Sequence, residues 1–322
     1  MKKIAVLTSG GDSPGMNAAV RAVVRSAIHF NYSVAGVRFG FKGLIEGDFI
    51  ELSSSDMSGI IQIGGTILKS ARSQEFLNEK GRAEAARQLR EKGIEALIVI
   101  GGDGTFQGAT LFSQEHDVTV VGVPATIDND LIGTDETIGY DTALNTAMDA
   151  IDKIRDTADA HDRLFLIEVM GRDSGFIALE TGIASGAELI LLPETLKNID
   201  QIKSTLKEIL SSHRRSTLVV VAEGDETGGA LKLSEQLGDD FKKYDMRVSI
   251  LGHIQRGGSP TAHDRVLASR LGFEAVQAIH EGHSRVMVGV VNHRAKITPL
   301  KMTFGRKKEI NFDLVELSKV LR

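Results

Sequence analysis

Residues 96–130 read ALIVIGGDGTFQGATLFSQEHDVTVVGVPATIDND and decide the fold. Two β-branched runs, Ile98–Ile100 and Val120–Val123, are each followed at once by a polar segment, GGDGT at 101–105 and PATIDND at 124–130. The runs predict parallel strands, and open α/β sheets bind ligands where such strands end. Glycines let backbone N–H groups approach an anion, and carboxylates can hold a divalent metal or take a proton. The pattern therefore indicates a phosphoryl-transfer site.

Strand-like runs recur along the rest of the chain and alternate with helical stretches. Many of the runs are continuously apolar, as expected for strands that are covered on both faces. They are Ile4–Leu7, Val34–Val37, Ala96–Ile100, Val118–Val123, Leu164–Val169, Leu189–Leu192, Leu218–Ala222 and Val286–Val291. Periodicity and end signals predict helices at Asn17–Phe30, Arg82–Lys92 and Asp141–Thr157. We therefore predict an α/β fold with mostly parallel sheets between layers of helices.

Length, charge and composition limit the functions that are open to the chain. Its 322 residues allow one large domain or two moderate ones, and no shift in composition marks a boundary. The formal net charge of −5 argues against nucleic acid as the main partner. The absence of cysteine excludes disulfides and thiolate chemistry. The apolar stretch Ile4–Leu7 is too short for a signal-peptide core, and no run is long enough to span a bilayer, so we expect a cytoplasmic protein.

Each polar segment also has a purely structural alternative. Asp103 between Gly102 and Gly104 suits a magnesium ion that bridges phosphate oxygens, but it also fits a tight turn in which Asp103 caps a helix. In extended backbone Asp128 and Asp130 face the same side, where two close carboxylates need a shared cation or proton. The alternative is an Asx-rich turn. In phosphoryl transfer the natural roles are a base for the acceptor hydroxyl and a carboxylate beside the metal.

Further candidate loops flank these two segments. The loop Thr8–Asn17 leads into a helix and suits a phosphate, although it is neither a Walker A motif nor a dinucleotide-binding motif. Met170–Gly175 and Ala222–Gly224 follow apolar strands, and Gly252–Pro260 closes another apolar run. Arginine beside glycine offers a planar fork to a phosphate. A lone Glu223 is as well explained as a structural hydrogen-bond partner.

The ordered motifs carry a resemblance to a known family. They read TSGGDSPGMNAA, GGT…SAR, GGDGT, TIDND, IGYDTA, RDTA, EVMGR, AEG and GHIQRGGSP. This set resembles the bacterial ATP-dependent 6-phosphofructokinases, most strongly over residues 3–270. The resemblance implies the glycolytic transfer of the ATP γ-phosphoryl group, with Mg²⁺, to the 1-hydroxyl of fructose 6-phosphate. It also implies two Rossmann-like three-layer α/β/α domains: an ATP-binding domain at 1–139 plus 253–302 and a fructose 6-phosphate-binding domain at 140–252 plus 303–322.

The resemblance further implies a role for each matching residue. Asp128 is the base that takes the hydroxyl proton, Thr126 positions the sugar, Arg172 stabilises the transferring charge, and Asp130 assists Asp103 near the metal. The ATP site comprises Gly11, Arg72, Ser73, Gly102, Asp103, Gly104 and Thr105. The sugar-phosphate site comprises Thr126, Ile127, Asp128, Met170, Gly171, Arg172, Glu223, His253, Ile254, Gln255 and Arg256, with Arg163 and Arg247 reaching it from a neighbouring subunit of a homotetramer.

An effector site is also implied, and it departs from the family pattern. The matching residues are Arg21, Arg25, Arg155, Gly186, Glu188 and Arg214, in a pocket where a diphosphate nucleotide activates and phosphoenolpyruvate inhibits. Ser54, Gly59 and Ser212 replace the usual Arg, Asp and Lys. Because two cations are lost, we expect inhibition by phosphoenolpyruvate to be weak or absent.

Other departures bear on the phosphoryl donor. Ala125 stands where the family usually has glycine, and Leu77 where a basic residue often contacts the nucleotide, so both affect the expected ATP affinity. Pyrophosphate-dependent relatives typically carry Asp at the position of Gly104 and Lys at that of Ala125, which favours ATP here. Residues 174–178 look more like those relatives, so pyrophosphate remains an alternative. A catalytically silent sugar-phosphate sensor is a third alternative, although it has little need for Asp103, Asp128, Asp130 and Arg172 together.

Overall fold

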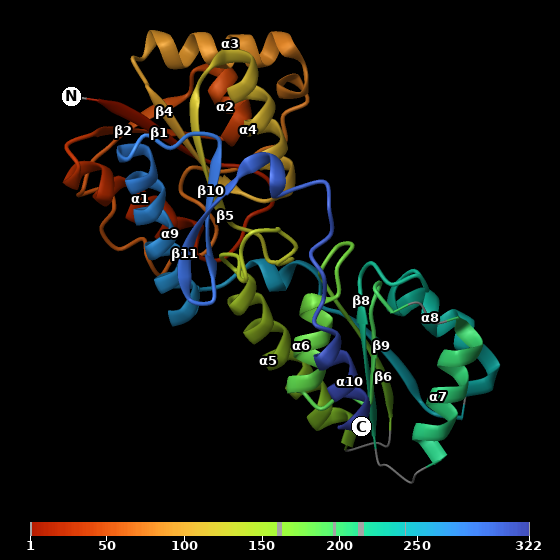
Figure 1. The fold of residues 1–322 in the computed structure, drawn as a ribbon. Helices are drawn as coiled ribbons and strands as arrows, with labels where there is room; N and C mark the ends of the chain where they lie inside the picture. Colours follow the sequence, from red (N-terminus) through yellow and green to blue (C-terminus); the bar gives the residue numbers. More distant parts are fainter. Residues whose placement is uncertain (1, 160–162, 196–197, 212–215, 242, 322) are drawn as a thin grey trace. The chain divides into compact units, whose positions relative to one another are not determined.

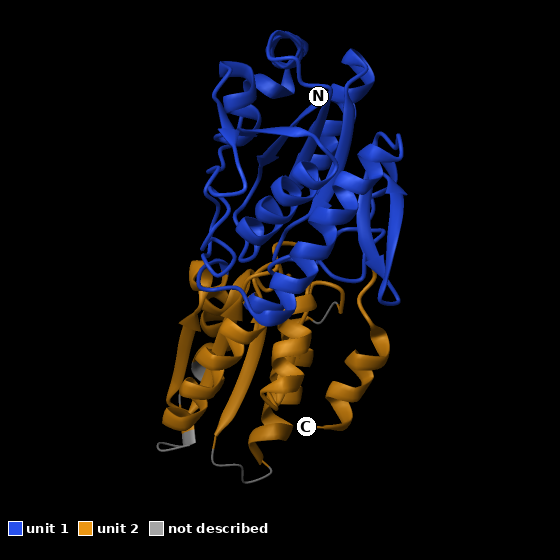
Figure 2. Cartoon of the chain, turned by 90° about the vertical axis from the view of Figure 1, so that its left-hand side faces the viewer, with its two compact units in different colours: residues 1–142, 256–308 blue, residues 143–255, 309–322 orange. Residues whose placement is uncertain are grey.

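The computed structural model describes residues 2–159, 163–195, 198–211, 216–241 and 243–321. The chain forms two compact units, residues 1–142 with 256–308 (unit 1) and residues 143–255 with 309–322 (unit 2), which Figure 2 shows in blue and orange. The domain bounds expected from the resemblance also assign a substrate to each domain, and they remain a prediction. Within the described ranges, no helix is long and apolar enough to cross a membrane.

Unit 1 is built on a seven-stranded sheet with the order β11-β10-β5-β4-β1-β2-β3 (Figure 1). The parallel strands are β1 (Lys3–Thr8), β2 (Ser33–Val37), β4 (Ala96–Gly101), β5 (Thr119–Pro124) and β10 (Val286–Val291). β3 (Phe49–Leu52) and β11 (Arg294–Pro299) pair antiparallel at the two edges. In the register of the central strands, Val6 lies opposite Ile98, which lies opposite Val121.

Alternate residues of these strands enter two cores on opposite faces of the sheet. Ile4 and Val6 pack with α1 (Met16–His29) and α9 (Ala262–His280) on one face. Ala5 and Leu7 pack on the other face. That face is covered by α2 (Gly40–Glu46), η1 (Glu75–Leu77), α3 (Glu79–Glu91), α4 (Asp103–His116) and η4 (Leu300–Met302). Unit 1 is therefore a three-layer α/β/α structure.

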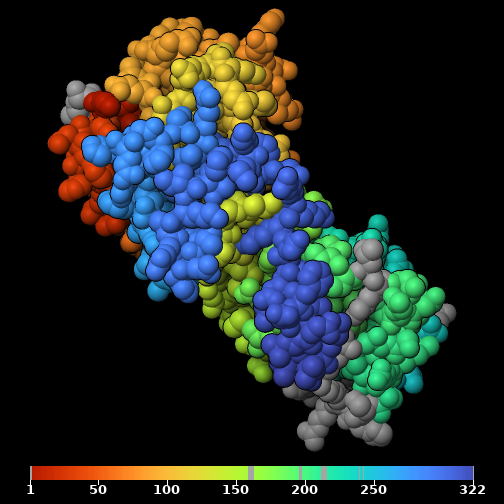
Figure 3. All heavy atoms as spheres, viewed as in Figure 1, coloured from red at the N-terminus to blue at the C-terminus, as the bar shows by residue number. Residues whose placement is uncertain are grey.

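Unit 2 has a four-stranded parallel sheet with the order β7-β8-β6-β9. The strands are β6 (Leu164–Val169), β7 (Leu189–Leu191), β8 (Thr217–Ala222) and β9 (Met246–Ile250). The helices α7 (Ile199–Ser211) and α8 (Gly229–Leu237), with η2 (Gly238–Phe241), pack on one face. On the other side of the strands lie α5 (Tyr140–Asp159) and α6 (Phe176–Ala184) (Figure 1). The last helix, α10 (Phe312–Val320), packs against α6, and its side chains are the darkest blue in Figure 3.

The predicted fold class and main elements are confirmed. Each of the eight predicted strands is present, and the three predicted helices correspond to α1, α3 and α5. β3, β9 and β11 are not among the predicted strands. Their sequences, FIEL, MRVSI and RAKITP, each contain a charged residue that interrupts the apolar run, and all three strands are only partly buried at sheet edges.

Candidate functional site

Three loops meet at the carboxyl edge of the central strands of unit 1. Because β5, β4 and β1 are neighbours in the sheet, the segments that follow them lie side by side. The N–H of Ser9 donates to the carbonyl of Ile100 (3.0 Å), and the N–H of Ala125 donates to the carbonyl of Gly101 (2.9 Å). A Cβ at Gly101 would lie 2.5 Å from both the Ser9 carbonyl oxygen and Thr105 Oγ1, so this close approach needs glycine. The structure therefore places the GGDGT segment against both neighbouring loops.

Asp103 occupies the first position of α4 and is not its cap. The N-cap residue is Gly102, and no side chain caps the helix, so the alternative in which Asp103 serves as a cap is wrong. The Asp103 carboxylate accepts a hydrogen bond from Gln107 Nε2 (2.8 Å). A Cβ at Gly104 would meet no atom within 4 Å. The positive end of the helix dipole beside open space suits an anion, and the carboxylate oxygen suits the hard cation that accompanies phosphates.

The segment from Thr126 to Asp130 forms a turn. Asn129 has a φ of 50°, in the left-handed region. The expectation of an extended backbone between Asp128 and Asp130 is therefore wrong, and the turn alternative is correct for the backbone. Asp128 is nevertheless held inside the protein: it is 7% exposed, and its N–H donates to Thr126 Oγ1 (3.2 Å).

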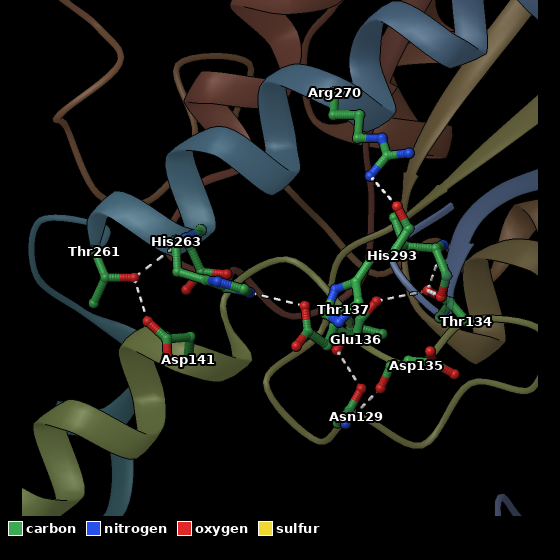
Figure 4. Close-up of polar contacts among 12 residues, drawn as sticks. Asn129, Thr134, Asp135, Glu136, Thr137, Asp141, Thr261, His263, Arg270 and His293 are labelled. Atoms are coloured by element: carbon green, nitrogen blue, oxygen red, sulfur yellow. Dashed lines mark hydrogen bonds and ion pairs between the residues drawn. The ribbon is translucent and has the colours of Figure 1, made fainter. Parts of the chain in front are cut away.

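The side chain of Asn129 anchors this turn from within (Figure 4). Its Nδ2 donates to the carbonyl of Asp135 (3.1 Å), and its Oδ1 accepts from Thr137 Oγ1 (3.4 Å) and from Lys308 Nζ (3.2 Å). Asparagine also tolerates the left-handed backbone better than most residues. Asn129 therefore fixes the path of the chain between the two aspartates.

The remaining ATP-site residues of the resemblance lie in loops around this edge. Arg72 is exposed, and Ser73 Oγ accepts from the N–H of Phe76 (3.2 Å), the second residue of η1. The guanidinium of Arg256 lies over Gly11, with Nη1 2.8 Å from where a Cβ would stand, and it donates to the carbonyl of Asp12 (3.3 Å). In unit 1 the structure therefore places Arg256, which the resemblance assigns to the sugar phosphate, on the glycine loop.

The methyl group of Ala125 points into the core. Ala125 is 1% exposed and belongs to the hydrophobic cluster that includes Val123 and Ile138. It therefore fills core space rather than space around the glycine loops. Leu77, by contrast, is 69% exposed.

In unit 2 a second group of predicted residues gathers at the carboxyl edge of β8, β6 and β9. The N–H of Met170 donates to Gln255 Oε1 (3.3 Å), and the N–H of Arg172 donates to Glu223 Oε2 (3.4 Å). Arg172 has a φ of 56°, an uncommon conformation for arginine, which aims its backbone N–H at this carboxylate. Gly171 lies within this group, and the exposed residues His253 and Ile254 lie in the adjoining turn η3 (Gly252–Arg256).

Arg163 and Arg247 lie at the opposite edge of the same sheet. Arg163 Nε contacts Asp245 Oδ2 (2.6 Å), and Arg247 Nη2 contacts Asp245 Oδ1 (2.8 Å). The hydrogen bond from Arg163, followed by that from Arg247, lowers the pKa of Asp245. Arg163 precedes β6 and Arg172 follows it, so the six-residue strand separates them by about 20 Å. Within unit 2 the structure does not bring the two arginines to Arg172.

The effector residues of the resemblance fall into both units. Arg21 and Arg25 share α1, and burial together with the charge of Arg25 lowers the pKa of Arg21. In unit 2, Arg155 Nη2 donates to the carbonyls of Ser185 (2.6 Å) and Gly186 (2.9 Å). Glu188 Oε2 accepts from the N–H of Leu218 (2.8 Å). Arg214 and Ser212 lie outside the described residues.

Sequence reasoning gave no role to the residues that support the turn. Asn129 belongs to the quoted motif TIDND, and Thr137 stands directly before the motif IGYDTA. A short polar side chain in a loop carries no sign of the backbone group that it will contact, so neither role could be found from the sequence.

Comparison with known proteins places these observations in a family. The family described as "Phosphofructokinase" matches residues 3–279. The ATP-dependent 6-phosphofructokinase 2 of Bacteroides thetaiotaomicron is 52% identical over 321 residues, covering 100% of this chain and 98% of the relative. The ATP-dependent 6-phosphofructokinase 1 of Thermus thermophilus is 55% identical over 321 residues, covering 100% of this chain and 99% of the relative.

Solved structures agree on the fold. The phosphofructokinase of Saccharomyces cerevisiae superimposes with a TM-score of 0.87 at 38% identity over 99% of this chain, which spans 46% of the yeast chain. A pyrophosphate-dependent phosphofructokinase from Marinobacter aquaeolei gives a TM-score of 0.84 at 23% identity, over 97% of this chain and 86% of its own, and supports the fold alone.

Proposed function

This chain belongs to the phosphofructokinase family, and on that premise we propose that it transfers the γ-phosphoryl group of ATP to the 1-hydroxyl of fructose 6-phosphate, giving fructose 1,6-bisphosphate and ADP. The observation that carries this proposal is the meeting of the GGDGT loop (101–105) and the PATIDND loop (124–130) at neighbouring strand ends. One presents a helix N-terminus and open space for phosphates, and the other holds the buried Asp128. Positioning and electrostatic stabilisation of this kind are what phosphoryl transfer requires.

Each residue of the loops takes a role in this reaction. Asp128 takes the proton of the 1-hydroxyl as the oxygen attacks the γ-phosphorus. Thr126, which already accepts from the N–H of Asp128, fixes the sugar relative to that carboxylate. Arg172 supplies positive charge to the phosphoryl oxygens, on which negative charge builds up in the transition state. Asp130 assists from the end of the turn.

Magnesium fits the chemistry of Asp103. Mg²⁺ in such sites takes one or two carboxylates and completes its octahedron with phosphate oxygens and water. Among the residues that the structure describes there is no group of three or more potential metal-ligating side chains, which agrees with a metal that is bound mainly through the nucleotide. Asp103 would hold the ion, and the ion would neutralise charge on the phosphates.

ATP is the donor that the loop favours over pyrophosphate. The open space beside Gly104 leaves room for a nucleotide, whereas an aspartate there would add negative charge beside the phosphates. Ala125 is buried, so a lysine at this position would have to leave the core to reach a phosphate. We expect product when purified protein, fructose 6-phosphate and Mg²⁺ are combined with ATP, and none with pyrophosphate. Product with pyrophosphate would reverse the donor assignment, and no product with either donor would favour the silent sensor.

We further propose a homotetramer that works in the cytoplasm, with Arg163 and Arg247 serving the sugar phosphate of a neighbouring subunit. Their place at the far edge of the unit 2 sheet from Arg172 supports this. The test mixes Asp128→Ala, which lacks the base, with Arg247→Ala, after dissociation and reassembly, and assays at a fructose 6-phosphate concentration so far below the KM of Arg247→Ala that neither variant alone is active. Recovered activity in the mixture shows sharing of the site between subunits, whereas a mixture as inactive as its components would place all the residues on one chain.

A further inference from the structure

A buried carboxylate outside the proposed reaction site joins the two catalytic loops of unit 1. Asp264, in the first turn of α9, is fully buried. Its Oδ1 accepts from the N–H of Gly139 (2.8 Å), and its Oδ2 accepts from the N–H (2.8 Å) and Oγ1 (2.5 Å) of Thr142. These donors lie in segment 137–142, where α5 begins, so the carboxylate satisfies backbone groups of another element and not of its own helix.

Segment 137–142 contacts the catalytic turn directly. Thr137, which is fully buried, donates from Oγ1 to the carbonyl of Thr126 (2.6 Å). The N–H of Ile138 donates to the carbonyl of Pro124 (3.1 Å), and Ile138 forms a parallel bridge with Ala125. Segment 137–142, which Asp264 holds, therefore packs directly against the turn that carries Asp128.

The same segment packs on the first glycine loop. A Cβ at Gly15 would lie 2.7 Å from Ile138 Cγ2, and a Cβ at Gly139 would lie 2.5 Å from the Cβ of Ser13. Both glycines have positive φ, 105° and 99°. A shift of this segment by a few tenths of an ångström would therefore displace both loops at once.

We propose that Asp264 is a positioning residue for phosphoryl transfer, which acts through segment 137–142 on the carbonyl of Thr126 and on the loop at Ser13–Gly15. This inference rests on the proposed function. In this proposal Asp264 does not contact substrate. It sets the distance between Asp128 and the loops that are proposed to bind phosphate. A misplacement of about 1 Å at reacting groups costs about 10²-fold in rate.

The acceptor geometry of Asp264 explains why a carboxylate stands at this position. Burial raises the pKa of Asp264, although its hydrogen bonds with Thr142 and Gly139 oppose the effect. The two carboxylate oxygens together accept from three donors, the N–H of Gly139 and the N–H and Oγ1 of Thr142. An amide has one acceptor oxygen and therefore cannot hold both ends of this segment in the same way.

The test compares Asp264→Asn and Thr137→Val with wild type and with Glu136→Gln. This control lies directly before segment 137–142, and its half-exposed carboxylate contacts His263. Valine keeps the shape of Thr137 and removes the donor to Thr126. We expect kcat to fall about 10²-fold in each test variant, with KM for both substrates within about threefold of wild type. Thr137→Ser, which keeps the hydroxyl, should restore kcat, and Glu136→Gln should match wild type.

The double variant separates a shared route from two independent defects. If Asp264 acts through Thr137, the combined loss of kcat will be no larger than the greater single loss, because both changes break one chain of contacts. Full kcat in either folded single variant, or losses that multiply in the double variant, would overturn the proposal. If Asp264→Asn does not fold, Thr137→Val alone decides. Wild-type protein without kinase activity would instead refute the proposed function.

Discussion

The proposed base in unit 1, Asp128, is buried and braced, whereas two of the candidate arginines of unit 2, Arg172 and Arg247, are exposed. Asp128 is 7% exposed and lies in a turn that Asn129 and Thr137 hold from behind. In unit 2 the side chains of Arg172 and Arg247 are 70% and 54% exposed. Under the proposed assignment, unit 1 holds the reacting carboxylate in place without substrate, and we expect the exposed arginines of unit 2 to become ordered when they bind a phosphate.

The two arrangements suit two tasks. A base must lie within hydrogen-bond reach of its proton, so any freedom of Asp128 lowers the rate. A guanidinium that recognises a phosphate can be ordered by its ligand, at a cost of about 0.5–1.5 kcal/mol for each side chain. Changes to Asp128 or its supports should therefore affect kcat or stability, and changes to Arg163 or Arg247 should affect KM for fructose 6-phosphate.

Asp128→Asn gives the largest expected effect and tests the braced side of the comparison. The amide keeps the size and much of the hydrogen bonding but cannot take a proton, so kcat should fall about 10²–10⁴-fold. Calorimetry should give a Kd for fructose 6-phosphate within about threefold of wild type. The amide removes the ability to take a proton in the transition state and leaves most contacts of the bound sugar in place.

The matched control for this change is Asp149→Asn, which removes a surface carboxylate that pairs with Lys153. It should leave both quantities unchanged. A kcat of Asp128→Asn within threefold of wild type would remove Asp128 as the base.

Glu115→Gln tests the ion pair through which Arg82 on α3 contacts α4, the helix that begins at Asp103. Arg82, whose side chain is 8% exposed, contacts Glu115 on α4 and donates to the carbonyls of Phe76 and Leu77. Removing one partner of a buried pair costs ~3–5 kcal/mol, and we expect about 2 here because glutamine still accepts one bond and Glu115 is partly exposed. Urea unfolding at pH 7 measures the loss.

The pH dependence of this loss has a definite sign. The hydrogen bond from Arg82, with its charge, lowers the pKa of Glu115. A lowered pKa contributes stability that is present above the unfolded value, about 4.3, and is lost as pH falls through the folded value. The difference between wild type and Glu115→Gln should therefore shrink in acid, and a difference that grows in acid would contradict the assignment.

The same contrast explains what could be predicted from the sequence. Apolar runs such as Ile98–Ile100 identify strands because burial on both faces demands them. Glycine and aspartate after such runs identify the candidate phosphate loops. Glycine lets the backbone approach a ligand closely, and aspartate supplies a carboxylate. The support from Asp264 could not be predicted, since its contacts join residues more than a hundred positions apart. The support from Thr137 could not be predicted either, since a loop hydroxyl gives no sign that it will donate to the carbonyl of Thr126. Alternation in TIDND gave the wrong geometry because the left-handed Asn129 breaks the extended backbone.

Asp245→Asn tests the exposed side of the comparison. Asp245 holds both Arg163 and Arg247, and its removal frees two cations for a phosphate. Exposed ion pairs are weak, so KM for fructose 6-phosphate should fall only about two- to threefold, with kcat unchanged. A rise in KM of tenfold or more would mean that Asp245 positions the arginines, and that unit 2 is braced in the same manner as unit 1.

His263→Gln gives the smallest expected effect. It tests whether the cost of a substitution depends on the exposure of the side chain or on the unit in which the residue lies. His263 Nε2 lies 2.8 Å from Glu136 Oε2 in unit 1, and the side chains are 50% and 43% exposed (Figure 4). Partial burial acts to lower the pKa of His263, but the hydrogen bond and charge of Glu136 prevail and raise it. A raised pKa contributes stability that is full below the unfolded value, about 6.5, and is lost as pH rises through the folded value.

Unfolding of His263→Gln and wild type should therefore differ at pH 5.5 and coincide at pH 8.5. Solvent screening limits the difference at pH 5.5 to about 0.3 kcal/mol. When Glu136 is already replaced by glutamine, the further change His263→Gln should no longer alter stability at pH 5.5, because the histidine has lost its charged partner in this pair. Equal stabilities at both pH values would show that the pair contributes nothing. A loss of unfolding free energy well above 1 kcal/mol at pH 5.5 would mean that even exposed side chains of unit 1 are firmly held. The contrast between the units would then not depend on the burial of each side chain.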